Sequence, residues 1–385
     1  MADSARNSPS TRSTRRNNTP CLYASLSLLL PVLLSIYLYR IELLDPAPIP
    51  KPLLTHHNSV AVPRVNDKVL SGAELMGVGQ LVGPEDFAYE SVGKVLYTSC
   101  ADGWIKRVKL SQSGSVNETV VEDWVNTGGR PLGLALGRHG EVIVADADKG
   151  LLSLSKHGEI KLLTDQAEGI KFKLTDGVDV AQDGVIYFTD ASYKHTLSEF
   201  IWDILEGRPY GRLMSYDPKT EETKVLVRDL YFANGVTMSP DQDSVVFCET
   251  PIRRCRKYYI NGERKGELEI FIDNLPGFPD NIRYDGEGHY WIALPTANTI
   301  VWDLTMKYPV IRKGVAIMTR YVGRPYMDKN AGVYQVDLQG KPIAYYYDPT
   351  FQLITGGLKI GNYLYLGSLF YGYIIRLDLI QHAAS

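Results

Sequence analysis

Six stretches of the chain share one pattern of apolar and polar positions. In each, a short apolar segment leads to a turn rich in Gly or Asp, and a strand rich in Val, Ile and aromatic residues follows. The six copies are PEDFAYESVGKVLYTS, RPLGLALGRHGEVIVAD, TDGVDVAQDGVIYFTD, ANGVTMSPDQDSVVFCE, PDNIRYDGEGHYWIA and TGGLKIGNYLYLGS. A further apolar strand, such as GRLMSYDPKT or GVYQVDLQGK, comes after each copy, so each unit supplies about four strands.

Six such units predict an all-β fold, a six-bladed β-propeller whose blades stack around a central channel. An open solenoid is the alternative, although it would tolerate a less regular turn pattern. The segment 194–211 breaks the strand pattern, because Leu197, Ile201 and Leu205 follow helical spacing. We predict a short helical insertion here that caps one mouth of the channel.

The amino-terminal end follows a different pattern. From Cys21 to Tyr39 no residue is charged, and as a helix this stretch would span about 28 Å, close to the ~30 Å of a hydrocarbon core. Four arginines precede it against one acidic residue, namely Arg6, Arg12, Arg15, Arg16 and Asp3. This charge bias predicts a single-pass type II signal anchor that leaves the propeller in the lumen or outside the cell. A cleaved signal peptide is the alternative.

The predicted organisation therefore has four parts: a cytosolic basic tail (1–20), a transmembrane anchor (21–39), a stalk leading into the propeller (40–75), and the propeller (76–385). We expect a location in the endomembrane system, in the endoplasmic reticulum, the vacuole or the plasma membrane. A formal net charge of -3, without Lys/Arg clusters in the folded part, argues against nucleic acid as a partner.

Two features bear on a lumenal location. If 250–253 form a hairpin turn, Cys248 faces Cys255, and a cross-strand disulfide is allowed; two reduced, buried thiols are the alternative. Asn117 begins an Asn-Glu-Thr sequon, and we predict that it is glycosylated if this domain is lumenal.

Polar residues recur where each repeat begins. These positions hold Glu85, Leu132, Asp176, Asn234, Asp280 with Asn281, and Thr355. Because the first strand of every propeller blade lines the axis, these side chains should converge on one point. Carboxylates gathered there would repel one another without a hard cation, and Ca²⁺ prefers such oxygen ligands. We therefore predict one calcium ion in the channel; the alternative is that these residues merely cap turns.

The sequence resembles a known family. GPEDFAYE, GRPLGLAL, LTDGVDV, FANGVTMSPD, ETPIRRCR, FPDNIRYD and LYLGSLF are similar, in this order, to segments of the strictosidine synthase-like proteins. The resemblance extends to the membrane-anchored adipocyte plasma membrane-associated protein and, more remotely, to paraoxonases and gluconolactonases. It implies that the ion is held by Glu85, Asp176, Asn234, Asp280 and Asn281. Asp176 stands where paraoxonases usually have Asn, and its added charge should tighten cation binding.

Two departures from the family bear on activity. Strictosidine synthases have a catalytic Glu where this chain has Thr355, and the paraoxonase histidine dyad begins where this chain has Leu132. We therefore expect a lumenal calcium-dependent hydrolase of the arylesterase or lactonase type, acting on a small-molecule ester or lactone, with Asp280 or Asp176 as catalytic base. The alternatives are a non-catalytic binding propeller with structural calcium, and a strictosidine synthase of alkaloid biosynthesis.

Overall fold

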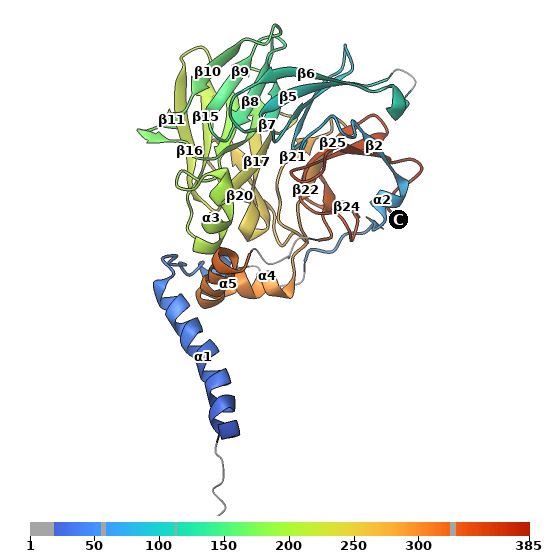
Figure 1. Cartoon of the computed structure of the whole chain (residues 1–385). Coiled ribbons are helices and arrows are strands. Elements are labelled where there is room, and N and C mark those ends of the chain that lie inside the picture. Colours follow the sequence, from blue (N-terminus) through green and yellow to red (C-terminus); the bar gives the residue numbers. More distant parts are fainter. Residues whose placement is uncertain (1–18, 55–58, 112–113, 324–328) are drawn as a thin grey trace, which may run out of the picture.

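The described residues fold into six blades around a channel, five of four strands and one of five, as the six repeats predict (Figure 1). The structure, a computed structural model, describes residues 19–54, 59–111, 114–323 and 329–385. Within these residues each of the first four blades is a run of consecutive antiparallel strands. Their bounds are β3–β6 (Phe87–Glu90, Val95–Ser99, Trp104–Lys109, Val120–Asn126), β7–β10 (Pro131–Leu136, Val142–Asp146, Gly150–Leu154, Ile160–Thr164), β13–β16 (Thr175–Val180, Ile186–Asp190, Gly211–Asp217, Glu222–Leu230) and β17–β20 (Ala233–Met238, Ser244–Glu249, Arg254–Tyr259, Leu268–Ile272).

The last two blades join both ends of the chain. The fifth combines β21–β24 (Ile282–Tyr284, His289–Leu294, Gly332–Asp337, Pro342–Tyr347) with β1 (Val65–Asn66), which pairs in parallel with β24. The sixth takes β25–β27 (Ile354–Ile360, Tyr363–Ser368, Ile374–Asp378) from the carboxyl end and β2 (Ala73–Met76) from the amino end. The antiparallel pairing of β2 with β27 closes the ring by joining its two ends.

Helices gather at one mouth of the channel. The predicted insertion is present as η3 (Leu197–Glu199) and α3 (Phe200–Glu206), and the helix ends where Gly207 adopts a left-handed conformation with φ 65°. Between β22 and β23 the chain forms two helices that the repeat pattern does not predict, α4 (Ile300–Lys307) and α5 (Pro309–Tyr321). Shorter elements are η1 (Lys51–Leu53), α2 (Val69–Gly72), η2 (Val116–Glu118), η4 (Thr250–Ile252) and the hairpin β11–β12 (Gln166–Ala167, Ile170–Lys171).

The helix α1 (Thr19–Ile41) projects from the end of the propeller where α4 and α5 lie (Figure 1). In the described part of the chain, no helix combines the length and the apolar character that crossing a membrane requires. The anchor at 21–39 therefore stays a prediction, and most of the basic tail lies outside the described residues. The segment after α1 packs against the helices, because Ile49 is buried and the Ala47 N–H donates to the Glu206 carbonyl (2.8 Å).

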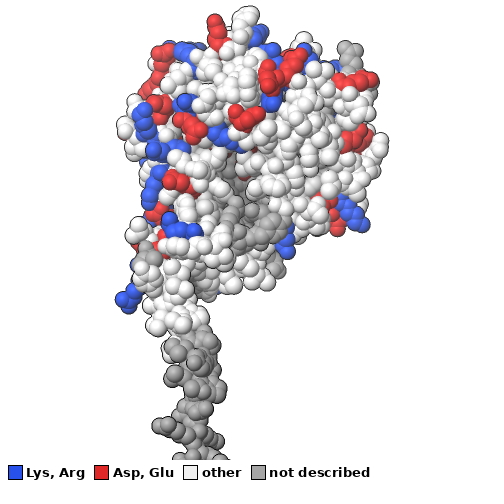
Figure 2. Space-filling model, viewed as in Figure 1, with Lys and Arg blue, Asp and Glu red and all other residues white. Residues whose placement is uncertain are grey.

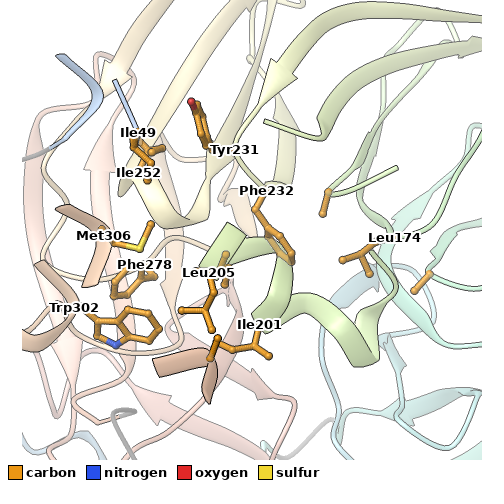
Figure 3. Packing of buried hydrophobic residues seen from close by; sticks show 14 of the residues in the cluster. Ile49, Leu174, Ile201, Leu205, Tyr231, Phe232, Ile252, Phe278, Trp302 and Met306 are labelled. Atoms are coloured by element: carbon orange, nitrogen blue, oxygen red, sulfur yellow. The ribbon is translucent and has the colours of Figure 1, made fainter. Parts of the chain in front are cut away.

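A cluster of apolar side chains connects these helices to the blades (Figure 3). Ile201 and Leu205 of α3 and Trp302 and Met306 of α4 belong to it, and the Trp302 and Phe278 rings lie 5.0 Å apart between centroids. Burying these side chains stabilises the helices by about 1.5–3 kcal/mol for each large residue. The cluster fixes the position of the helices over the channel mouth.

The structure also confirms the predicted cross-strand disulfide. β18 and β19 are in register with Cys248 opposite Cys255 and Glu249 opposite Arg254, and the two sulfurs are bonded. The turn between the strands contains η4 and then Arg253 in a left-handed conformation. Asn117 lies in η2 and its side chain is exposed, whereas its glycosylation stays a prediction.

Candidate functional site

The predicted channel positions converge on one cavity of about 380 Å³. It is lined by residues that open the innermost strand of all six blades: Glu85, Leu132, Asp176, Asn234, Asp280 and Thr355. Each is either the second residue of that strand or stands two residues before it. Asn281 is buried beside this group, and its Nδ2 donates to Glu85 Oε1 (2.7 Å).

The backbone around these positions follows one local design. In four blades the pairing of the innermost strand shifts register at its beginning, as at Thr175/Val178 and Ala233/Val236. Such bulges reorient a side chain at the end of a strand. Gly177 follows Asp176 at this point, and a Cβ there would lie 2.8 Å from the Asn234 carbonyl oxygen. Glycine therefore lets neighbouring innermost strands approach closely around the axis.

We call the six lining positions that open the innermost strands, together with Asn281, the channel ring. This ring concentrates carboxyl groups away from water. Glu85 and Asp176 are buried, whereas Asp280 is partly exposed. Burial, followed by repulsion from neighbouring carboxylates, holds the pKa of Glu85 and of Asp280 well above the ordinary range. The same two effects, burial first, raise the pKa of Asp176 to about 8. In the absence of a cation, the ring therefore disfavours its own ionised form.

Two buried oxygens in the ring lack a hydrogen-bond partner among the described residues, Glu85 Oε2 and Asn234 Oδ1. The Asn234 amide is oriented by its Nδ2, which donates to Thr250 Oγ1 (3.3 Å). Orphaned oxygens beside buried carboxylates are the donors that Ca²⁺ requires. Among the described residues, no group of three His, Cys, Asp or Glu side chains is arranged to hold a metal ion. Calcium binding would therefore depend on amide as well as carboxylate oxygens.

Arg130 also lines the cavity, although it is absent from the ligand set that the sequence predicts. Among the described residues that line the cavity, Arg130 is the only Lys, Arg or His. Its Nη1 donates to the Pro131 carbonyl (2.7 Å), and its charge opposes the rise in the pKa of both Glu85 and Asp176. One sign in the sequence that Arg130 lines the cavity is its place two residues before Leu132, in GRPLG.

A second arginine spans the channel beyond the ring. Arg283 of β21 forms a buried ion pair with Asp86 and donates to the carbonyls of Leu134 (2.8 Å) and Val178 (3.1 Å). Asp86 also accepts the Leu134 N–H (2.9 Å). These contacts tie the fifth blade to the first three. Since Arg283 lies in an ordinary alternating strand, sequence pattern gave no sign of this role.

Most residues of the cavity wall are apolar, and the capping helices contribute part of them. α3 and η3 contribute Leu197, Phe200, Ile201 and Ile204, and α4 contributes Trp302. Phe232 and Phe278, which Figure 3 shows within the hydrophobic cluster, also line the cavity. Such a combination, an apolar cavity with a few convergent polar groups, is typical of small-molecule sites.

Thr355 has a structural contact instead of an acid–base function. Its Oγ1 donates to the Glu85 carbonyl oxygen (3.1 Å), which ties the sixth blade to the first. The pKa of a threonine hydroxyl is too far from neutral for the side chain to serve as a general acid or base. No histidine is among the described residues that line the cavity. Outside this lining, His195 pairs with Glu206 (3.0 Å) and His289 with Asp285 (3.3 Å).

Comparison with known protein families gives two matches. The family described as "Strictosidine synthase" matches residues 176–263, and "Strictosidine synthase-like, N-terminal" matches residues 65–108. Protein STRICTOSIDINE SYNTHASE-LIKE 6 of Arabidopsis thaliana is 57% identical over 358 residues, which cover 93% of this chain and 95% of that protein. The adipocyte plasma membrane-associated protein of Gallus gallus is 36% identical over 361 residues, covering 88% and 85%.

Solved structures share the propeller fold at low identity. A gluconolactonase of Xanthomonas campestris superposes with a TM-score of 0.57 at 16% identity, covering 88% of this chain and 99% of that one. The calcium-binding protein regucalcin of Agrobacterium tumefaciens superposes with a TM-score of 0.55 at 16% identity, covering 77% and 90%. At this identity the likeness concerns the fold alone.

Proposed function

This chain belongs to the strictosidine synthase-like family. We propose that its channel is the active site of a calcium-dependent ester or lactone hydrolase. The main support for this proposal is the group of carboxylates at the base of a mostly apolar cavity. Two oxygens of the channel ring, Glu85 Oε2 and Asn234 Oδ1, lack a hydrogen-bond partner among the described residues. The solved relatives in fold include a gluconolactonase and a calcium-binding protein, which supports this chemistry for the same type of channel.

Glu85, Asp176, Asn234 and Asp280 would hold the ion, together with Asn281, whose Nδ2 also fixes the position of Glu85. When bound, calcium supplies polarisation of a carbonyl group and stabilises negative charge that develops on its oxygen. Either Asp280 or Asp176 accepts the proton of the attacking water, and the partial exposure of Asp280 to the cavity favours Asp280. Arg130 adds hydrogen-bond donors on the same cavity wall.

We propose that the protein does not carry out strictosidine synthesis, and Thr355 supports this. That condensation needs a group that takes and returns a proton, and Thr355 instead holds the Glu85 backbone. The alternative is a non-catalytic propeller in which calcium has a structural role.

We also propose that residues 21–39 anchor the protein in an endomembrane and that the propeller is lumenal or extracellular. Exposed apolar side chains on α1, including Leu30, Leu33 and Leu34, support the anchor. The disulfide and the exposed Asn117 sequon suit an oxidising, glycosylating compartment.

The test uses the full chain purified in detergent. Hydrolysis of phenyl acetate and of a simple γ-lactone is measured with calcium and with a chelator, for the wild type and for Glu85→Gln and Asp280→Asn. We expect turnover that needs calcium and is lost in both variants. The control Glu263→Gln changes an exposed carboxylate in the turn between β19 and β20 and should retain activity. Calcium binding without turnover would instead support the non-catalytic alternative.

A further inference from the structure

The outer side of the two unpredicted helices, α4 and α5, is apolar. Its exposed residues are Ile300, Val301, Leu304, Tyr308, Val310, Met318, Tyr321 and Val322, which we call the α4–α5 surface. Ile300 has 79% of its surface exposed and Val310 has 59%. Among the exposed residues of 300–322, only Asp303, Lys307 and Arg320 carry charge. A contiguous apolar surface of this kind on a folded protein marks an interaction site.

Both helices carry apolar residues on their exposed sides. The buried side of α4 is mainly apolar as well, whereas the buried residues of α5 are Arg312 and Ala316. In α4 the inward residues Trp302 and Met306 are buried against the blades. In α5 the exposed positions Val310, Met318 and Tyr321 follow the spacing of one helix face, opposite buried Ala316. A helix that contacts water on its outer side would carry polar residues at those positions.

The helix α5 lies beside the end of α1. Arg320 of α5 donates from Nε and Nη2 to the Glu42 carboxylate (2.8 and 3.0 Å), directly after α1 ends. The Lys313 Nζ lies 4.7 Å from the centre of the Tyr39 ring. Figure 1 shows α4 and α5 at the end of the propeller from which α1 projects, and in Figure 2 charged side chains gather mainly on the opposite part of the propeller.

We propose that the α4–α5 surface lies in the headgroup region of a lipid bilayer, beside the point where α1 enters it. The residues at this junction combine Tyr and basic side chains, namely Tyr39, Arg40, Tyr308, Lys313 and Arg320. Tyrosine and basic residues are enriched at the boundary between hydrocarbon and water. An interfacial helix buries its apolar face to a depth of about 5–10 Å, which the outward residues of α4 and α5 can supply.

This position places the cavity mouth next to the bilayer. Trp302 lines the cavity from the inner side of α4, while its neighbour Val301 is exposed on the outer side. α3, whose residues form much of the remaining apolar wall, packs against α5. The substrates would then be esters or lactones that partition into membranes, a conclusion that rests on the proposed function.

The test measures the depth of single labelled residues in the full chain reconstituted into phosphatidylcholine liposomes. A Cys21→Ser background carries an environment-sensitive fluorophore at Leu304→Cys or Val310→Cys, and the buried Cys100 is retained. Lipids with a quencher attached to the acyl chain should reduce emission at both sites. The control is Val92→Cys, a residue of the first blade with 94% exposure, where no loss is expected.

Emission at Leu304 and Val310 that is as insensitive to quencher lipids as at Val92 would overturn the proposal. Shielding from aqueous iodide without lipid quenching would also overturn it, because it would indicate a protein partner. The double variant Leu304→Glu, Val310→Glu should lose hydrolysis of a long-chain ester held in liposomes and retain hydrolysis of soluble phenyl acetate. If no form of the protein hydrolyses either ester, the proposed function fails, whereas the quenching results still decide the membrane contact.

Discussion

Replacing Arg283 by methionine should strongly destabilise the propeller, although methionine keeps an unbranched apolar stem. The guanidinium contacts the Asp86 carboxylate and the carbonyls of Leu134 and Val178 inside the channel. In Arg283→Met the fully buried Asp86 would retain the Leu134 N–H as a donor but would lose its counter-ion. Leaving one charge of a buried pair uncompensated costs about 3–5 kcal/mol.

For a chain of this size, about 2 °C per kcal/mol converts this loss into a fall in Tm of ~6–10 °C. Circular dichroism of the full chain during heating and urea unfolding measures both quantities. Arg264→Met is the matched control, because Arg264 pairs with Glu267 and Glu269 at the surface. A loss in Arg283→Met no larger than in this control would refute the reasoning.

The double variant Arg283→Met, Asp86→Leu separates the ion pair from the packing around it. Since both charges are then removed, much of the lost stability should return. If the double variant is less stable than Arg283→Met alone, the guanidinium acts through its carbonyl contacts and the counter-ion argument fails.

Four further predictions concern the ring and its surroundings. Because the pKa of Asp176 is raised to about 8 without calcium, the unfolded state loses its proton first, so calcium-free stability should fall as pH rises from about 4 to 8; calcium should remove this slope in thermal melts. Gly177→Ala should cost about 1–3 kcal/mol in urea unfolding, since its Cβ would press on the Asn234 carbonyl. Asn117→Gln should abolish an endoglycosidase-sensitive mass shift of the protein from microsomes, and its persistence would argue against this sequon. The wild type and Thr355→Glu should form no strictosidine detectable by mass spectrometry from tryptamine and secologanin, and product from the wild type would contradict our interpretation of Thr355.

Much of the fold follows from local repetition in the sequence. Each blade begins with a similar apolar segment, so the repeats indicated six blades, and a fixed position within them indicated the ring residues Glu85, Asp176 and Asn234. The disulfide was predictable because a four-residue turn sets the register of β18 and β19. α4 and α5 were missed, since strand repeats carry no signal for a helical insertion inside one blade.

The two channel arginines show where local patterns stop being informative. Arg283 looks like an outward polar residue of an alternating strand, yet it is buried because the innermost strands of four blades surround it. Arg130 lies directly before β7 and lines the cavity together with residues of the other blades. Both roles depend on contacts between blades that are distant in sequence, and only the closed propeller brings those blades together.

The family relationship and the chemistry of this chain have to be judged separately. A relative at 57% identity establishes the family, whereas the fold and the position of the channel come from the structure. Thr355 stands where the resemblance leads us to expect the catalytic glutamate of a synthase. Thr355 donates to the backbone of Glu85, the residue whose side chain we propose as a calcium ligand. The same position that would supply proton transfer in a synthase therefore holds the backbone of a proposed calcium ligand here. Under the proposed function the channel would polarise a carbonyl group, and it lacks at Thr355 the acid–base side chain that condensing an amine with an aldehyde needs.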